Sequence, residues 1–399
     1  MQRRNLFIEF LRATWGIWLY VRYRPTVVNH EVVKGRPGPF LILGNHVMNA
    51  DPMLISRYID QRVHYVANDA VFRSPVMAFF MKLVGGIPKS KSVNDMETIR
   101  HVMDIRRDGG VIGIFPEGQT SWDGRTGPII ESTAKLVRLL KIPVIAAINK
   151  GGYLAFPRWA LKRRKGPIQI EFSQILSVEE IKQLDVDGIY TRIRTALNFD
   201  ASAFARDKGL DYISKRGAEG LERALYACPR CSQFGTLETG ANRLSCRNCG
   251  YRAIYDSRGH FVKENPDSDG AGPIFTNMGD WGDWQRKLLA KHMEASSTER
   301  QIIGDRVRIF TGYRRKKMIP YCMGSMQLYA DRLEICPRLK KQMHIPLAAI
   351  GGASIFKQDR LEFYYEGTLY RCTFPGRRSS ALIYLDAING AIDKPPELP

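Results

Sequence analysis

Short apolar runs alternate with amphipathic stretches along the first half of the chain. The apolar runs predict β-strands at 40–43, 63–67, 111–115, 143–148 and 168–172. The amphipathic stretches predict helices over 96–107 and 129–140, and others that begin at Ser74-Pro75 and at Ser177, where Glu180 completes a capping box. Because strands and helices alternate, we predict an α/β domain at 35–215 in which helices cover a mainly parallel sheet.

The N-terminal stretch at 6–21 is strongly apolar, but Glu9 and Arg12 interrupt it. It is shorter than the ~20 residues of a membrane-spanning helix, and no small-residue cleavage site of a signal peptide follows it. On a helix, the other residues would surround a single narrow stripe formed by Asn5, Glu9, Arg12 and Gly16. We therefore predict that 1–34 holds an amphipathic helix in a membrane interface; the alternative is a helix buried against its own domain.

The pattern changes after about residue 227. A Pro-, Gly-, Ser- and Asp-rich stretch at 264–273 predicts a linker, and a short amphipathic helix with Trp281 and Trp284 follows it, so we assign 263–300 to a linker and helix. From about residue 307, short apolar runs predict β-strands, and a helix with an apolar face ends the chain. These strands are predicted at 307–310, 325–330, 332–335, 344–350, 360–365 and 368–374. The region 301–399 is thus a β-rich domain, compatible with a small pleckstrin-homology-like barrel.

Four of the seven cysteines form the pattern C-x2-C-x14-C-x2-C, which comprises Cys228, Cys231, Cys246 and Cys249. Two C-x2-C knuckles at this spacing are typical of a zinc ribbon, here placed at 216–262. Four thiolates leave no open coordination position, so the predicted Zn²⁺ is structural. Two disulfides or an iron site are the alternatives, and both are less compatible with the reducing compartment that the cysteine usage indicates.

The chain is basic, with 60 lysine and arginine residues against 40 aspartate and glutamate residues and a formal net charge of +20. It is 44% hydrophobic, which is enough to build a core and excludes disorder for most of its length. Such a charge favours an acidic partner, whether nucleic acid, an anionic membrane surface or a phosphorylated substrate. Two of the basic clusters lie at 158–165 and 314–317.

The first predicted strand runs into a loop that contains His46, and Asp51-Pro52 then resembles a helix N-cap followed by a first-turn proline. Functional sites form at this edge of α/β sheets. The loop is long enough for the Asp51 carboxylate to bind one imidazole nitrogen of His46. The other nitrogen could then accept a proton from a hydroxyl, as a general base does.

Three further motifs follow the H-x4-D pair in order: G-x-I-P-x-x-K at 85–91, F-P-E-G at 115–118 and I-P-V at 142–144. Together they resemble the glycerophospholipid acyltransferase family, which includes the 1-acylglycerol-3-phosphate acyltransferases, over about 35–175. The resemblance implies acyl transfer from a thioester, acyl-CoA or acyl carrier protein, to a glycerolipid hydroxyl. It implies that His46 is the general base and Asp51 its orienting partner. Glu117 and Gly118 would line the acceptor site, although Glu117 could equally be a structural carboxylate that binds loop amides.

The sequence departs from the family where an acceptor phosphate would bind. Thr120 and Lys91 stand where the family usually has arginine, and lysine gives only a point charge where arginine binds phosphate with two hydrogen bonds. Ala146 replaces a second proline of the last motif. Two explanations stay open: Lys89, Lys91 and Arg125 compensate for the missing arginines, or the acceptor is a lysophospholipid with a larger head group or a glycolipid. The predicted substrate-binding set is Asn45, Lys89, Lys91, Glu117, Gly118 and Arg125.

The sequence thus predicts a peripheral (monotopic) acyltransferase on the cytoplasmic face of a membrane. Its predicted acceptor is a lysoglycerophospholipid, with lysophosphatidic acid favoured, and the lipid motifs make nucleic acid an unlikely partner. The alternative is a basic zinc-ribbon binding protein whose acyltransferase-like domain is inactive or repurposed.

Overall fold

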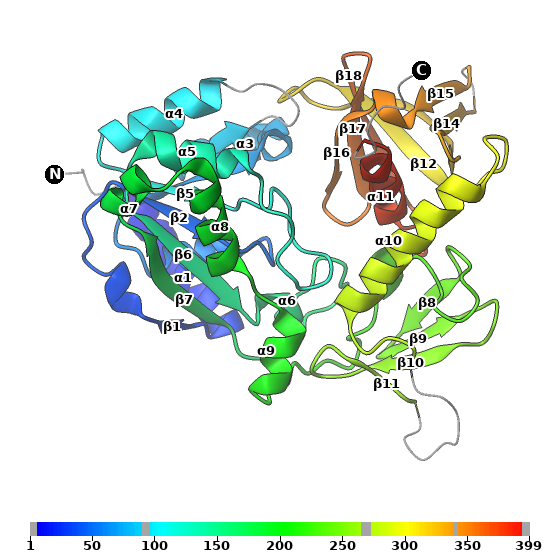
Figure 1. Ribbon diagram of the computed structural model, residues 1–399, viewed down its shortest axis with the longest axis horizontal. Helices are drawn as coiled ribbons and strands as arrows, with labels where there is room; N and C mark the ends of the chain where they lie inside the picture. Colours follow the sequence, from blue (N-terminus) through cyan, green and yellow to red (C-terminus); the bar gives the residue numbers. More distant parts are fainter. Residues whose placement is uncertain (1–5, 90–95, 265–272, 339–340, 393–399) are drawn as a thin grey trace. The chain divides into compact units, whose positions relative to one another are not determined.

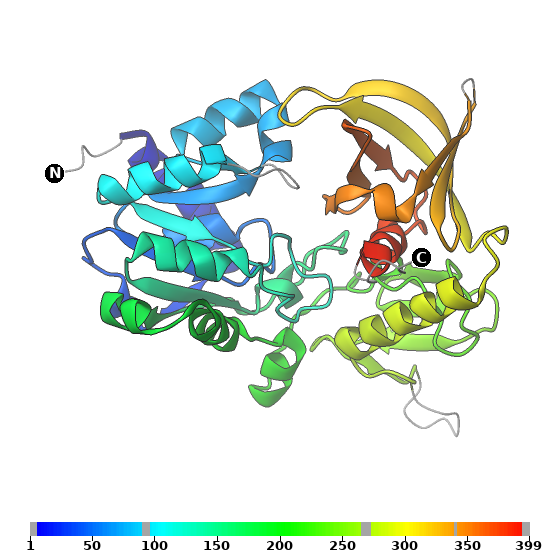
Figure 2. The same ribbon diagram turned by 45° about the horizontal axis from the view of Figure 1, so that its top comes forward.

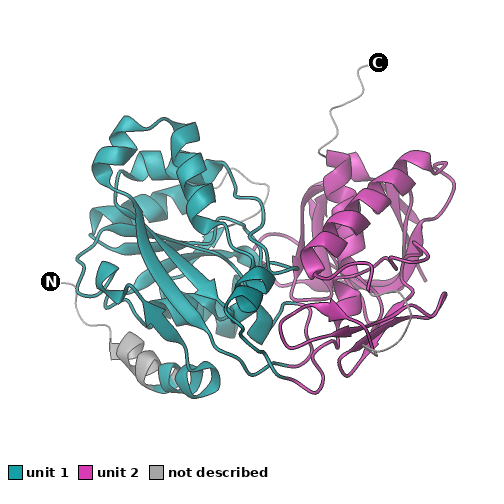
Figure 3. Ribbon diagram, turned by 60° about the horizontal axis from the view of Figure 1, so that its bottom comes forward, with its two compact units in different colours: residues 1–158, 163–213 teal, residues 159–162, 214–399 magenta. Residues whose placement is uncertain are grey.

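The computed structural model describes residues 6–89, 96–264, 273–338 and 341–392. The chain divides into two compact units (Figure 3). Unit 1 contains Met1–Arg158 and Arg163–Ile213, and unit 2 contains Trp159–Lys162 and Ser214–Pro399.

Unit 1 is built on a seven-stranded sheet with the order β1-β7-β6-β2-β5-β3-β4 (Figure 1). Neighbouring strands are parallel except β6 and β7, which confirms the predicted mainly parallel sheet. The strands are β1 (Thr26–Val28), β2 (Phe40–Gly44), β3 (Val63–Asn68), β4 (Ile87–Lys89), β5 (Val111–Ile114), β6 (Val144–Lys150) and β7 (Gln169–Leu176). Strands β1 and β4 were not predicted, because three residues are too few to show a period.

Helices cover both faces of this sheet. They are α1 (Leu6–Tyr23), α2 (Asp51–Ser56), α3 (Pro75–Leu83), α4 (Met96–Arg107), α5 (Ser132–Leu140), α6 (Gly152–Ala155), α7 (Val178–Gln183), α8 (Val186–Leu197) and α9 (Ala201–Asp207), with short 3-10 helices at His30–Val32 and Asp69–Arg73. Val137 of α5 and Ile193 of α8 belong to one buried cluster, whereas Leu19 of α1 and Leu54 of α2 belong to a second. The clusters lie on opposite faces, and α1 is seen behind the sheet in Figure 1.

Helix α5 begins at Ser132 rather than at the predicted residue 129. The preceding segment is held by the F-P-E-G loop instead. The amide of Ile130 donates to the Pro116 carbonyl over 2.9 Å, and the amide of Gly127 donates to Glu117 Oε2 over 2.8 Å. The capping box at α7 is confirmed, because the side chains and amides of Ser177 and Glu180 bond reciprocally.

Helix α1 shows features of both alternatives considered for it. Leu19 and Tyr23 are buried in the core of unit 1, and Arg57 Nη1 donates to the Gly16 carbonyl over 2.9 Å. The remaining described large apolar side chains of its last two turns are exposed: Ile17, Trp18, Tyr20 and Val21. Among the described residues, no helix has both the length and the hydropathy that crossing a membrane requires.

Unit 2 contains two antiparallel sheets. The smaller sheet has the order β11-β10-β9-β8 and consists of β8 (Leu237–Gly240), β9 (Arg243–Cys246), β10 (Arg252–Tyr255) and β11 (Phe261–Val262). A 3-10 helix at Leu221–Arg223 precedes it, and α10 (Met278–Ala295) follows. The buried Trp281 of α10 donates its indole N–H to the Ala227 carbonyl over 3.0 Å, which ties α10 to the cysteine-bearing segment.

The second sheet of unit 2 has seven strands in the order β15-β14-β13-β12-β18-β17-β16 and curls into a half-barrel (Figure 2). Its elements are β12 (Ile303–Gly312), β13 (Ile319–Leu328), β14 (Arg332–Pro337), β15 (Met343–Pro346), a 3-10 helix (Leu347–Ala349), β16 (Gly351–Phe356), β17 (Arg360–Tyr365), β18 (Thr368–Thr373) and α11 (Ala381–Ile392). The predicted β-rich region closed by a helix is therefore confirmed. Its kinship with pleckstrin-homology domains stays a prediction.

Candidate active site and metal site

His46 lies in the loop after β2, and its Nδ1 is 2.9 Å from Asp51 Oδ2. The same Oδ2 accepts hydrogen bonds from the amides of Val47 (2.8 Å) and Met48 (2.9 Å). The predicted N-cap role of Asp51 is wrong: Ala50 occupies that position, and Asp51 is the first residue of α2. Its carboxylate instead folds back onto the preceding loop and holds His46 there.

Asn149, near the end of β6, supports this pair from behind. Its Nδ2 donates to Asp51 Oδ1 over 2.7 Å, so four donors converge on the fully buried carboxylate. Asn45 is buried as well: its Oδ1 accepts from the Asn149 amide (2.7 Å), and its Nδ2 donates to the Asn149 carbonyl (3.2 Å). Asn45 thus positions the loop. Sequence reasoning missed Asn149, for which the available signal was an amide side chain directly after the apolar run at 143–148.

The imidazole of His46 stacks on Phe115, with ring centroids 4.4 Å apart and an interplanar angle of 24°. Phe115 in turn stacks on the buried Tyr65 at 5.6 Å. A carboxylate can only accept a hydrogen bond, so Nδ1 carries the proton in this pair and Nε2 keeps its lone pair. The His46 side chain is 20% exposed, which leaves it accessible to a reactant. This arrangement can perform general-base chemistry.

Glu117 joins the F-P-E-G loop to the histidine loop. Its Oε1 accepts from the His46 amide over 2.7 Å, and its Oε2 accepts from the Gly127 amide over 2.8 Å. Burial raises the pKa of Glu117 to about 8, although both amide bonds favour the ionised form. Gly118 adopts a φ of 68° in the turn that follows. These contacts favour the structural interpretation of Glu117, since both of its oxygens bind main-chain amides.

The structure shows no contact between His46 and the described members of the predicted basic set, Lys89 and Arg125. Lys89 is exposed at the end of β4, an edge strand separated from β2 by two others. Arg125 Nε lies 3.3 Å from Asp200 Oδ2. Lys91 falls outside the described residues. These three therefore stay predictions for substrate binding.

A different arginine reaches the position where the resembled family has one. Arg158 Nη1 donates to the carbonyl of Thr120 over 3.0 Å, and its guanidinium lies 4.5 Å from the centroid of the Trp122 ring. Burial lowers the pKa of Arg158 to about 9, which still leaves it protonated at neutral pH. Arg158 belongs to the basic cluster at 158–165, but the sequence alone did not connect it with Thr120.

The four predicted metal ligands meet in unit 2. The Sγ atoms of Cys228, Cys231, Cys246 and Cys249 all lie within 4.8 Å of one another, and none of these cysteines is in a disulfide. Cys228 and Cys249 Sγ are 3.6 Å apart, and Cys231 and Cys246 Sγ are 3.8 Å apart. Four thiolates about 2.3 Å from a tetrahedral zinc ion would be separated by about 3.8 Å. The cluster therefore fits a tetrahedral ion of that size.

Each C-x2-C segment forms the same tight turn around this cluster. The amide of Ser232 donates to the Cys228 carbonyl (2.9 Å), and that of Gly250 donates to the Cys246 carbonyl (3.0 Å). Ser232 and Gly250 both have positive φ, at 56° and 70°. The two turns thus hold the cysteines in equivalent positions, as expected for a site closed by four protein ligands.

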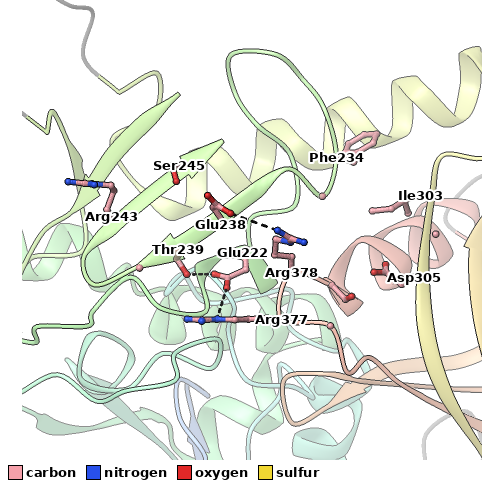
Figure 4. A pocket seen from close by; sticks show the side chains of 15 residues that line it. Glu222, Phe234, Glu238, Thr239, Arg243, Ser245, Ile303, Asp305, Arg377 and Arg378 are labelled. Carbon is pink, nitrogen blue, oxygen red and sulfur yellow. Dashed lines mark hydrogen bonds and ion pairs between the residues drawn. The ribbon is translucent and has the colours of Figure 1, made fainter. Parts of the chain in front are cut away.

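A separate hollow of about 970 Å³ lies within unit 2 (Figure 4). Its charged side chains face one another: Arg377 lies 4.0 Å from Glu222, and Arg378 lies 3.8 Å from Glu238. Asp305 accepts a hydrogen bond from the Tyr384 hydroxyl. These charges are offset by partners within the protein, and the hollow belongs to unit 2, whereas His46 belongs to unit 1.

Fold and site together define an α/β domain with a histidine–carboxylate pair at the carboxyl end of a strand. Residues 24–149 match the family model described as Acyltransferase. The chain therefore carries an acyltransferase-family domain, and the family resemblance is confirmed.

The relatives are distant. A chloroplastic 1-acyl-sn-glycerol-3-phosphate acyltransferase of Brassica napus is 23% identical over 36% of this chain and 42% of its own length. A 1-acyl-sn-glycerol-3-phosphate acyltransferase of Bacillus subtilis is 23% identical over 48% of this chain and 96% of its own length. The crystal structure of PlsC, a 1-acyl-sn-glycerophosphate acyltransferase from Thermotoga maritima, is 16% identical with a TM-score of 0.43, over 52% of this chain and 84% of that one. The chain thus spans less than half the length of the plant relative.

Proposed function

We propose that the chain transfers a fatty acyl group from a thioester donor to the hydroxyl of a lysoglycerophospholipid, a step of glycerophospholipid synthesis. Lysophosphatidic acid is the favoured acceptor, and acyl-CoA and acyl carrier protein are the candidate donors. The observation that carries this proposal is the 2.9 Å contact between His46 Nδ1 and Asp51 Oδ2 in a domain of the acyltransferase family. The names of the distant relatives support the choice of acceptor.

In the proposed reaction, Nε2 of His46 takes the proton of the acceptor hydroxyl while the hydroxyl oxygen attacks the thioester carbonyl carbon. Asp51 stabilises the imidazolium that forms. Collapse of the tetrahedral intermediate breaks the C–S bond, and the departing thiolate takes the proton back from His46. The ester and the free thiol are the products, so protons and electrons balance.

A membrane surface is the proposed source of the acceptor. The exposed Ile17, Trp18 and Val21 of α1 lie beside the exposed Arg22, a combination that suits the interface of an anionic leaflet. Tyr23 of the same helix shares a buried cluster with Val47 and Met48 of the histidine loop. On this proposal the protein is peripheral and works at the cytoplasmic face, where the four cysteines stay reduced.

We also propose that the four cysteines bind one Zn²⁺ ion with a structural role. Zinc would complete the two facing turns at Cys228–Cys231 and Cys246–Cys249, and four thiolates leave it no position for a substrate. The acyl transfer proposed above therefore uses no metal chemistry.

His46→Ala tests the proposed reaction. We expect the purified variant to keep the circular dichroism spectrum of the wild type and to lose acyl transfer by at least ~10²-fold, the usual scale of general-base catalysis. The assay crosses a panel of lysolipid acceptors with acyl-CoA and acyl carrier protein donors. A folded variant that transfers acyl groups at the wild-type rate would exclude His46 as the base. Wild-type protein that is inactive throughout the panel, yet binds nucleic acid at moderate salt, would favour the binding-protein alternative.

A further inference from the structure

Helix α3 is an apolar helix without a buried residue. It reads PVMAFFMKL, and none of its nine residues is buried. Its exposed large side chains, called here the α3 patch, are Val76, Met77, Phe79 and Phe80. Val76 and Phe79 are 66% and 62% exposed, and contiguous apolar surface of this kind marks a binding surface in a folded protein.

The connections of the sheet place α3 on the same face as α1 and α2. The steps from β2 through α2 to β3, and from β3 through α3 to β4, move in the same direction across the sheet. Crossovers between parallel strands are right-handed in nearly all cases, so both helices lie on one face. Leu54 of α2 shares a cluster with Leu19 of α1 on that face. The step from β4 through α4 to β5 moves in the opposite direction, so a right-handed crossover puts α4 on the other face. Val102 of α4 does lie there, in the buried cluster that contains Val137 of α5.

Helix α3 also begins near the edge of the sheet that carries His46. Helix α3 follows the carboxyl end of β3, and the His46 loop follows the carboxyl end of β2. Parallel strands direct these ends to the same edge of the sheet. The exposed apolar residues of α1 and α3 therefore occupy one face of unit 1, next to the edge that carries His46.

We propose that the α3 patch inserts into the acyl region of an anionic lipid leaflet as a second membrane contact beside α1. This inference rests on the proposed function, because it names the surface through which that site receives its lipid acceptor. The charge around the patch is complementary to such a leaflet: Lys82 and Lys89 are exposed, and α3 contains no acidic residue. Arg62 donates to the carbonyls of Lys82 and Leu83, which anchors the end of the helix to the domain.

A second copy of the chain fits this surface less well than a lipid leaflet does. In a symmetric contact each copy would present the same patch to the other. The Lys82 side chains would then approach without an acidic residue on α3 to offset them. A lipid leaflet supplies both the apolar layer and the negative charge.

Phe79→Ser tests the proposal with the full chain, and Leu139→Ser is its matched control. Leu139 is a similarly exposed apolar residue (49%), but it lies on α5, on the opposite face of the sheet. Binding is measured by flotation with vesicles of phosphatidylcholine and phosphatidylglycerol. We expect Phe79→Ser to lower the partition coefficient about tenfold, because burial of the phenyl ring in lipid is lost. The control should bind as the wild type does.

Two further measurements separate this inference from the proposed function. Acyl transfer to a dispersed, short-chain lysolipid should be the same for wild type and Phe79→Ser, since that acceptor needs no membrane contact. If the wild type transfers no acyl groups but Phe79→Ser still loses vesicle binding, the proposed function fails and the membrane contact stands. Equal vesicle binding by Phe79→Ser, Leu139→Ser and wild type would overturn the inference. The inference would also be overturned if light scattering gave a lower molar mass for Phe79→Ser than for the wild type while vesicle binding stayed the same, since the patch would then join two copies of the chain.

Discussion

Substitution of Glu117 by glutamine separates the two interpretations of this residue. The carboxylate bridges two loops, with Oε1 on the His46 amide and Oε2 on the Gly127 amide. Glutamine keeps one acceptor oxygen but turns an NH2 group toward the other amide donor, which leaves a buried N–H without an acceptor. Such a group costs about 1–3 kcal/mol. We therefore expect Glu117→Gln to be less stable than the wild type at pH 5.

The difference in the free energy of unfolding between wild type and Glu117→Gln should become smaller as pH rises. Burial raises the pKa of Glu117 from its ordinary 4.5 to about 8. Between these values the unfolded chain releases the proton while the native state retains it, so the free energy of unfolding falls as pH rises. At 1.36 kcal/mol per pH unit, the full interval corresponds to about 5 kcal/mol. Glutamine does not titrate, so the free energy of unfolding of Glu117→Gln lacks this fall with pH. Above pH 8 the variant should therefore be about as stable as the wild type or more stable.

Urea unfolding of both proteins at intervals from pH 5 to 8.5 measures this difference, and subtraction of the two curves removes the contribution of other titrating groups. If the free energies of unfolding of the two proteins followed parallel curves against pH, the reasoning would be refuted, because Glu117 would then be ionised in the native state from pH 5 to 8.5. Kinetics supply the second test. If Glu117 positions His46, Glu117→Gln lowers kcat and leaves the KM for the acceptor unchanged; if it binds the acceptor, the KM rises.

Two other predictions concern the support of the site and the metal. Asn149→Ala removes the donor to Asp51 Oδ1; we expect a stability loss of about 1–3 kcal/mol and a kcat at least tenfold lower, and a variant with the wild-type melting temperature and kcat would contradict this. Elemental analysis of protein equilibrated with zinc and freed of excess metal should give about one zinc ion per chain, and a strong chelator should lower the melting temperature. Zero zinc, with melting insensitive to the chelator, would exclude the structural metal.

Hydrophobic periodicity and capping residues predicted the fold well, because each of these signals depends on residues of one helix or strand alone. The helix at Met96–Arg107 has the predicted limits, and the capping box of Ser177 and Glu180 is formed. Signals failed where a glycine or proline hides the period. The run at 344–350 was predicted as one strand, but β15 ends at Pro346 and a 3-10 helix follows. Strand β16 was missed because it begins with Gly351-Gly352, which have no side chains to alternate.

The histidine–carboxylate pair was predictable for the same reason, since its members are separated by a short loop. The groups that fix this pair were not, because they come from distant parts of the chain. Asn149 binds Asp51 from β6, and Glu117 binds the His46 amide from the loop after β5. Neither residue needs to touch a substrate to matter, since each limits where the imidazole can lie. Substitutions at these two positions should therefore lower kcat more than they change the KM, although H-x4-D itself stays intact.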